Sequence, residues 1–87
     1  MEVVVGGVWL PVFTIGGKAY RVNMDEVITA LRNVEPEPVR RYYVVINGRS
    51  YPIKQVISVA LNIPRIAFTS MDAYRILRRL GFEIHQR

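Results

Sequence analysis

The sequence predicts a small α+β domain, in which two β-hairpins and a C-terminal strand pack on three short helices. Two observations predict this fold class. Apolar, β-branched runs flank Gly16–Gly17 and Asn47–Gly48, and such dipeptides are typical of two-residue hairpin turns. Short amphipathic stretches then follow each hairpin. The length of 87 residues corresponds to one domain.

The chain is expected to begin with strands. A run of valines ends at Gly6–Gly7, and a strand follows from Val8 to Ile15. Glycine accepts the positive φ of a tight hairpin turn, so Gly16–Gly17 should connect this strand to a returning strand at Ala19 to Val22.

The first helix should follow this hairpin. Asn23 and Glu26 have the three-residue spacing of a capping box. Apolar residues then recur at i, i+3, i+4 and i+7, namely Met24, Val27, Ile28 and Leu31. The helix should end near Asn33, because the two prolines of the segment 35–38 cannot continue it. We interpret that segment as a stiff hinge between a front half, residues 1–34, and a rear half, residues 39–87.

The rear half begins with a second hairpin and helix. Tyr42 to Ile46 is aromatic and β-branched, Asn47–Gly48 marks the turn, and Ser50 to Ile53 forms the returning strand. A helix from about Lys54 to Leu61 should follow.

The last helix begins at the capping-box spacing of Thr69 to Asp72 and ends at Gly81, a left-handed cap. Residues 82–85 then add one more strand. Two helices and a strand in this order resemble a helix-turn-helix or winged-helix unit, although the connection at residues 63–68 is long for such a turn.

The two hairpins share a sequence pattern. Ile15 to Val22 aligns with Ile46 to Ile53 at an offset of 31 residues, and each copy has a tyrosine three residues after the second turn residue. A duplicated ββα unit and convergence on common hairpin chemistry are both open interpretations.

Charge is distributed unevenly along the chain. Lys and Arg number 12 against 7 Asp and Glu, which gives a formal net charge of +5. Residues 1–39 have a net charge of −2 and residues 40–87 a net charge of +7. Ten of the twelve basic residues are arginine, whose planar guanidinium suits phosphate. The rear half is therefore expected to bind a polyanion, and a merely soluble basic surface is the alternative.

Candidate contacts with nucleic acid come from two clusters. On the last helix, Arg75, Arg78 and Arg79 should face outward; the alternative is that they complement the helix dipole and pair with Asp72. In the second hairpin, tyrosines alternate with basic residues, which suits base stacking beside phosphate contacts. The full set of candidates is Arg40, Arg41, Tyr42, Tyr43, Arg49, Tyr51, Lys54, Arg65, Arg75, Arg78 and Arg79.

Nothing in the sequence indicates catalysis, a metal or a cofactor. There is no cysteine, and the only histidine, His85, is interpreted as a frayed residue near the C-terminus. No apolar run approaches the ~20 residues of a membrane helix and no secretory signal pattern is present. We expect a cytoplasmic domain that is not an enzyme and has no small-molecule substrate.

A family resemblance covers about half of the chain. The sequence YVVINGRSYPIKQVI at 43–57, with RILRRLGFEI at 75–84, resembles the N-terminal head module of McrA-type HNH restriction endonucleases. That family usually has Ser-Gly-Gly where this chain has Thr69 to Met71, and no HNH motif follows here. The resemblance implies a DNA-associated module without nuclease activity, with matching positions at Arg49, Tyr51, Lys54, Arg75 and Arg79.

The sequence thus favours a non-catalytic nucleic-acid-binding protein, with DNA favoured over RNA. The alternative is a small protein-interaction module, or an accessory or regulatory subunit, with an acidic protein partner. The opposite charges of the two halves would also allow self-association into a homo-oligomer.

Overall fold

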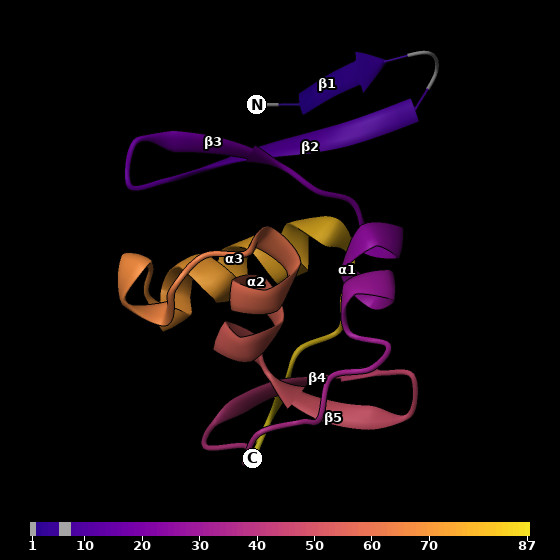
Figure 1. The fold of residues 1–87 in the computed structure, drawn as a ribbon, viewed down its shortest axis with the longest axis vertical. Coiled ribbons are helices and arrows are strands. Elements are labelled where there is room, and N and C mark those ends of the chain that lie inside the picture. Colours follow the sequence, from indigo (N-terminus) through magenta and orange to yellow (C-terminus); the bar gives the residue numbers. More distant parts are fainter. Residues whose placement is uncertain (1, 6–7) are drawn as a thin grey trace.

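The chain is built in three layers. The computed structural model describes residues 2–5 and 8–87, with side chains from Pro11 onward. Figure 1 shows a sheet of β1, β2 and β3 at one end, three α-helices in the middle, and a second sheet at the other end. The fold is the small α+β domain that the sequence predicts, and the N- and C-terminal strands lie at opposite ends of it.

The first sheet contains β1 (Glu2–Val5), β2 (Val8–Ile15) and β3 (Lys18–Arg21), antiparallel and in the order β1-β2-β3. Gly16 and Gly17 connect β2 to β3 with φ of 57° and 81°. Positive φ at both central residues matches the twist of the flanking strands, which confirms the predicted hairpin. The expected break at Gly6–Gly7 lies outside the described residues.

Helix α1 (Met24–Ala30) begins at its predicted cap, because the Asn23 Oδ1 accepts a hydrogen bond from the Glu26 amide at 2.8 Å. The helix ends earlier than the expected Asn33. After Ala30 the backbone changes to i→i−3 hydrogen bonds, such as Leu31 N to Ile28 O at 3.3 Å, and this tighter winding forms a turn at residues 31–33.

The second sheet contains β4 (Tyr42–Ile46), β5 (Arg49–Pro52) and the short β6 (His85–Gln86), in the order β5-β4-β6. Asn47 and Gly48 form the predicted turn, with φ of 54° and 76°.

The strand expected at residues 82–85 is displaced and shortened to β6. The Phe82 amide donates to the Leu77 carbonyl oxygen at 3.0 Å, which closes the end of the preceding helix. That amide is therefore not available for the sheet, and pairing with β4 begins only at His85.

Two helices follow the second hairpin. Helix α2 (Ile53–Leu61) begins directly after Pro52, and a 3₁₀ turn, η1 (Arg65–Ala67), lies in the connection to α3 (Ser70–Leu80). Thr69 and Asp72 form the predicted capping box: the Asp72 amide donates to Thr69 Oγ1 at 3.1 Å, and the Thr69 amide donates to Asp72 Oδ2 at 2.9 Å. Gly81 ends α3 with φ of 100°, as the sequence predicts.

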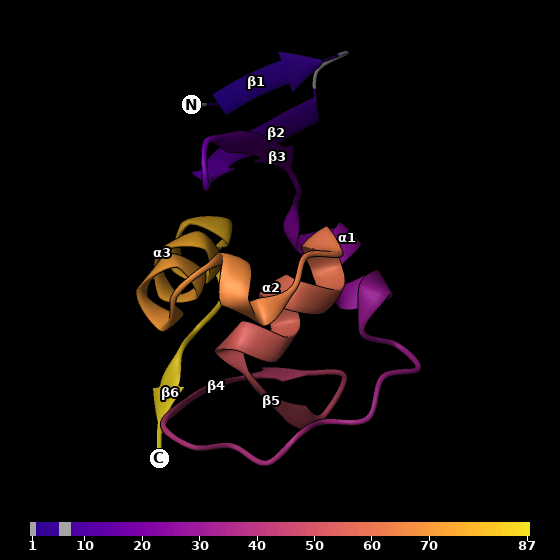
Figure 2. The ribbon, with the colours of Figure 1, turned by 60° about the vertical axis from the view of Figure 1, so that its left-hand side comes forward.

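The helices hold the two sheets together. Helix α2 lies at the centre, where it packs against α1, α3 and the second hairpin, and Val56 and Ile57 are fully buried. Phe13 and Ile15 of β2 join the same core, and β2 packs against α3. Figure 2 shows α3 at one side of the helical layer, with the chain descending from its end to β6.

The segment expected to be a hinge is hydrogen-bonded to side chains of the rear half. We call residues 34–38 the proline strap. Tyr51 Oη donates to the Val34 carbonyl oxygen at 2.7 Å, and the Gln55 side chain donates to the Glu35 carbonyl oxygen at 2.8 Å and accepts from the Glu37 amide at 2.9 Å. These bonds attach the strap to the rear half on both sides of Pro36.

Candidate nucleic-acid interface

Helix α3 presents a basic face to solvent. Its buried stripe consists of Ala73, Ile76, Leu77 and Leu80. The opposite face contains Arg75, Arg78 and Arg79, which are exposed, and the Arg75 side chain is 74% accessible. Because these three residues recur at i, i+3 and i+4, they lie together on one side of the helix.

An open hollow of about 490 Å³ is formed on this face by Tyr74, Arg75, Arg78 and Arg79. Tyr74 does not appear among the candidates from the sequence. Its position four residues before Arg78 would have placed it on the same face. The hollow therefore combines three guanidinium groups with one phenol ring.

Contacts between rings connect α3 to the basic start of the second hairpin. The Tyr42 and Tyr74 rings meet edge to face, with centroids 5.3 Å apart. The Arg41 Cζ lies 5.0 Å from the Tyr42 centroid, and the Arg78 Cζ lies 6.0 Å from the Tyr74 centroid. The structure thus unites parts of the two predicted clusters. We call the resulting set the arginine–tyrosine surface: Arg41, Tyr42, Tyr74, Arg75, Arg78 and Arg79.

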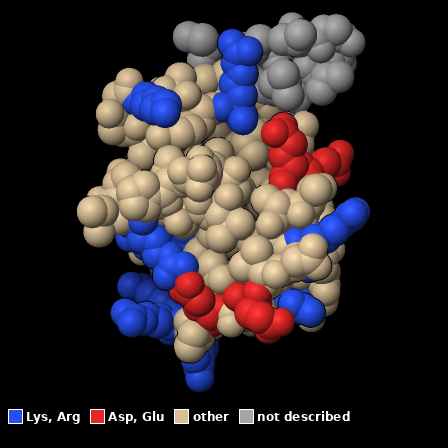
Figure 3. Space-filling model, in the orientation of Figure 1, with Lys and Arg blue, Asp and Glu red and all other residues tan. Residues whose placement is uncertain are grey.

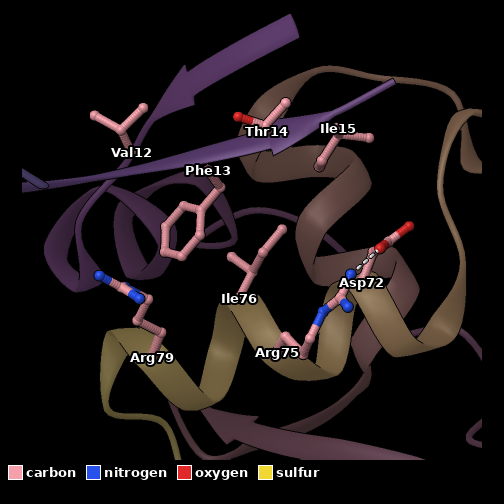
Figure 4. A pocket seen from close by; sticks show the side chains of 8 residues that line it. All are labelled: Val12, Phe13, Thr14, Ile15, Asp72, Arg75, Ile76 and Arg79. Carbon is pink, nitrogen blue, oxygen red and sulfur yellow. Dashed lines mark hydrogen bonds and ion pairs between the residues drawn. The ribbon is translucent and has the colours of Figure 1, made fainter. Parts of the chain in front are cut away.

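A groove of about 280 Å³ separates α3 from β2 (Figure 4). In Figure 4, Phe13 and Ile76 lie between the strand and the helix, and the Arg75 side chain extends to Asp72. The groove is lined by Val12, Phe13, Thr14, Ile15, Asp72, Arg75, Ile76 and Arg79. Since Arg75 and Arg79 line both this groove and the hollow, they form the ridge between the two.

The N-terminal end of α3 carries a carboxylate. The pKa of Asp72 is lowered by the hydrogen bond from the Thr69 amide, and further by the Thr69 hydroxyl and by the Arg75 guanidinium. Arg75 Nη2 donates to Asp72 Oδ1. Because the guanidinium of this pair is largely exposed, the pairing is weak and a phosphate can compete for it.

Two of the predicted arginines form ion pairs with glutamates of the proline strap. Arg49 pairs with Glu35, with Nη1 and Oε1 3.6 Å apart. Arg65 forms a two-pronged contact with Glu37, which lowers the pKa of that carboxyl group and raises the pKa of Arg65. These arginines lie against the strap and are not among the residues that line the hollow on α3 or contact its rings.

Tyr51 is buried, which is contrary to the surface contact expected from the sequence. Its side chain has 0% accessibility, and its hydroxyl donates to the carbonyl oxygens of Val34 and Leu31. It is a core residue and cannot contact a ligand at the surface. Lys54 is half-buried, with its Nζ 5.1 Å from the centroid of the Phe68 ring.

The neighbouring tyrosines of β4 face opposite ways, as the alternation of a strand requires. Tyr42 contacts α3, whereas Tyr43 stacks on His85 with centroids 5.2 Å apart and planes inclined by 26°. His85 is paired in β6 and so is not the frayed residue that the sequence suggested. Arg40 is exposed just before β4. The Arg87 amide donates to the Arg41 carbonyl oxygen at 2.7 Å, and the Arg87 guanidinium donates to the Val39 carbonyl oxygen.

The basic side chains of the molecule are not all joined in a single patch. On the face shown in Figure 3, Lys and Arg side chains occupy separate places, with Asp and Glu side chains between some of them. Within the described residues, no three His, Asp or Glu side chains gather as they would around a metal ion. None of the helices described is long and apolar enough to cross a membrane.

Comparison with known proteins gives a family but no function. No curated protein and no solved structure matches the chain. The resemblance to McrA-type head modules is not addressed by these comparisons and stays a prediction. A family model described as SCO5918-like matches residues 12–87, from within β2 to Arg87. The chain therefore belongs to the SCO5918-like family.

Proposed function

We propose that this protein is a non-catalytic nucleic-acid-binding protein that favours DNA over RNA. The observation that carries the proposal is the arginine–tyrosine surface, where α3 presents three exposed arginines and Tyr74 beside Arg41 and Tyr42. Arginine forks form paired hydrogen bonds with phosphate oxygens, and a phenol ring packs on sugars and bases. The net charge of +7 on residues 40–87 supports the same partner.

The shape of this surface favours duplex DNA. The arginines project from one side of a helix, and the major groove of B-DNA is wide enough to admit a helix. The major groove of A-form RNA is too deep and narrow for side chains to read. An exposed basic helix therefore suits DNA better than double-stranded RNA.

Fluorescence polarisation across a salt series tests the proposal. Labelled duplex DNA, single-stranded DNA and structured RNA are titrated with the protein between low and physiological salt. We expect duplex DNA to bind most tightly, with an affinity that falls steeply as salt rises, because bound phosphates release counterions. Absence of binding to every polymer at low salt would contradict the proposal.

Two double variants locate the site. Arg75→Ala/Arg79→Ala removes the ridge of the surface and should reduce the log–log salt slope by about two. Arg49→Ala/Arg65→Ala changes the net charge equally but removes arginines that lie outside the arginine–tyrosine surface, and it should leave the slope nearly unchanged. Equal effects of both pairs would show that only total charge matters and would exclude α3 as the site.

A protein-interaction module with an acidic partner is the second candidate function. The Ile66 side chain in η1 is 96% exposed, and so large an exposed apolar side chain beside Arg65 suits contact with another protein. Heparin separates the two functions. A nucleic-acid-binding protein should prefer duplex DNA to heparin of equal charge, whereas a basic docking surface should bind both alike.

A further inference from the structure

The basic stripe of α3 begins with an apolar side chain. Met71 lies in the first turn of α3, and its side chain is 53% exposed. It precedes Arg75 by four residues and Arg79 by eight, so all three lie on one stripe of the helix. Over this stripe the helix rises about 12 Å, with the exposed apolar group at one end and the guanidinium groups in the middle and at the other end.

The local charge makes the Met71 end unsuitable for phosphate. The Asp72 carboxylate adjoins Met71 and, like an ordinary aspartate, is negatively charged at neutral pH. The DNA backbone is therefore expected over Arg75, Arg78 and Arg79, which all follow Met71 along the helix, while the start of α3 lies deeper in the groove. When a recognition helix enters the major groove, its N-terminal residues meet the edges of the bases.

We propose that Met71 reads base edges in the major groove and favours thymine through the 5-methyl group. This inference rests on the proposed function and adds a specificity contact to it. The thymine methyl is the one apolar group that the bases present in this groove. The methionine side chain is flexible and polarisable, so it adapts to a methyl group at several positions. The capping box of Thr69 and Asp72 holds the backbone on either side of it.

Uracil substitution isolates this contact. A duplex of mixed sequence and the same duplex with deoxyuridine in place of every thymidine differ only in the 5-methyl groups. Burial of one methyl is worth about 0.8 kcal/mol, which corresponds to an affinity about fourfold higher for the thymine duplex with the wild-type protein. Met71→Ala should remove this preference, and Met71→Leu, which stays apolar, should keep it.

A matched control excludes a general effect of truncating an exposed apolar residue. The Val45 side chain on β4 is 52% exposed, nearly the same as that of Met71, but it faces the side of the second sheet away from the helices. Val45→Ala should retain the preference for thymine. Thermal unfolding shows whether each variant is folded. We expect both to fold, because about half of each residue is accessible to solvent in the wild-type protein.

The outcomes separate this inference from the proposed function. A wild-type protein that binds both duplexes equally, or a Met71→Ala variant that keeps the preference, would overturn the role of Met71 while salt-dependent DNA binding stood. No binding of either duplex at low salt would overturn both. Because the salt slope reports phosphate contacts, Met71→Ala should leave the slope unchanged, and a flattened slope would also contradict a contact with the bases.

Discussion

The two hairpin–helix units of this chain have the same strand register but different surroundings. In the front unit, residues 12–30, Ile15 pairs with Lys18 across the turn; in the rear unit, residues 43–61, Ile46 pairs with Arg49. Each pairing is offset by the same 31 residues. Each unit also receives a third strand, β1 or β6, on the outer side of its first hairpin strand.

The units differ in what covers them. Tyr51 of the rear unit is fully buried and donates to two carbonyl oxygens, whereas the equivalent Tyr20 is half-buried, with the Lys18 Nζ 5.4 Å from its ring centroid. Helix α2 lies in the centre of the core, while α1 packs on its side. A common local sequence therefore produces the same hairpin twice, and the segment that crosses over it decides which copy becomes core.

The largest expected effect tests this difference directly. Tyr51→Phe removes the hydroxyl and leaves the Val34 and Leu31 carbonyl oxygens without this donor, which should lower the free energy of unfolding by about 1–3 kcal/mol. Tyr20→Phe should change it by about 0.5 kcal/mol or less. Urea unfolding of both variants measures the two values, and equal losses would refute the contrast between the units.

The turns should behave alike. Gly17→Ala and Gly48→Ala each place a Cβ at positive φ, of 81° and 76°, and neither Cβ would meet another atom within 4 Å. Each substitution should therefore cost only the backbone strain, roughly 1–2 kcal/mol. Thermal or urea unfolding gives the comparison. A much larger loss of unfolding free energy at one turn would show that the substitution there disturbs more than the backbone conformation of the turn.

The helix starts should differ. Asn23→Ala removes the side chain that caps α1 and should cost about 1 kcal/mol, and Asn23→Asp should restore most of it. Helix α2 follows Pro52 without a side-chain cap, so its start depends on burial of Ile53 instead. An unchanged stability of Asn23→Ala would mean that α1 is held by packing alone, as α2 is.

The smallest expected effect concerns pH and the strap over the rear unit. The pKa of Glu37 is lowered from 4.5, chiefly by the hydrogen bond from Arg65, so the stabilisation is present above pH 4.5 and is lost as the pH falls through the lowered pKa. Because the pair is partly exposed, it contributes about 0.5 kcal/mol or less. Glu37→Gln should remove this part of the acid sensitivity in urea unfolding measured from pH 7 to pH 3. An identical pH profile would show that the pair does not contribute.

The sequence predicts the fold well where local chemistry decides. The turns at Gly16–Gly17 and Asn47–Gly48 and the caps at Asn23 and Thr69 are confirmed, because each depends on residues within four positions of one another. The position of β6 is not predicted, since residues 82–84 complete the end of α3 before the chain can pair with β4.

The candidate site is predicted only in part. Arg75, Arg78 and Arg79 follow from helical periodicity, and the structure places them on one exposed face. The pairing of Arg49 and Arg65 with the strap, and the burial of Tyr51 beneath it, depend on partner residues at least 14 positions away along the chain. No local pattern contains that information, so the sequence alone does not distinguish the arginines beside the strap from those on the exposed face of α3.

The contact between Arg87 and Arg41 has a practical consequence for handling the protein. The backbone hydrogen bond between them places the C-terminal residue beside the arginine–tyrosine surface. A purification tag or fluorophore attached after Arg87 would therefore begin close to Arg41, one residue of this surface. One attached ahead of β1 would leave the molecule at the opposite end, across a body whose longest dimension is 37 Å.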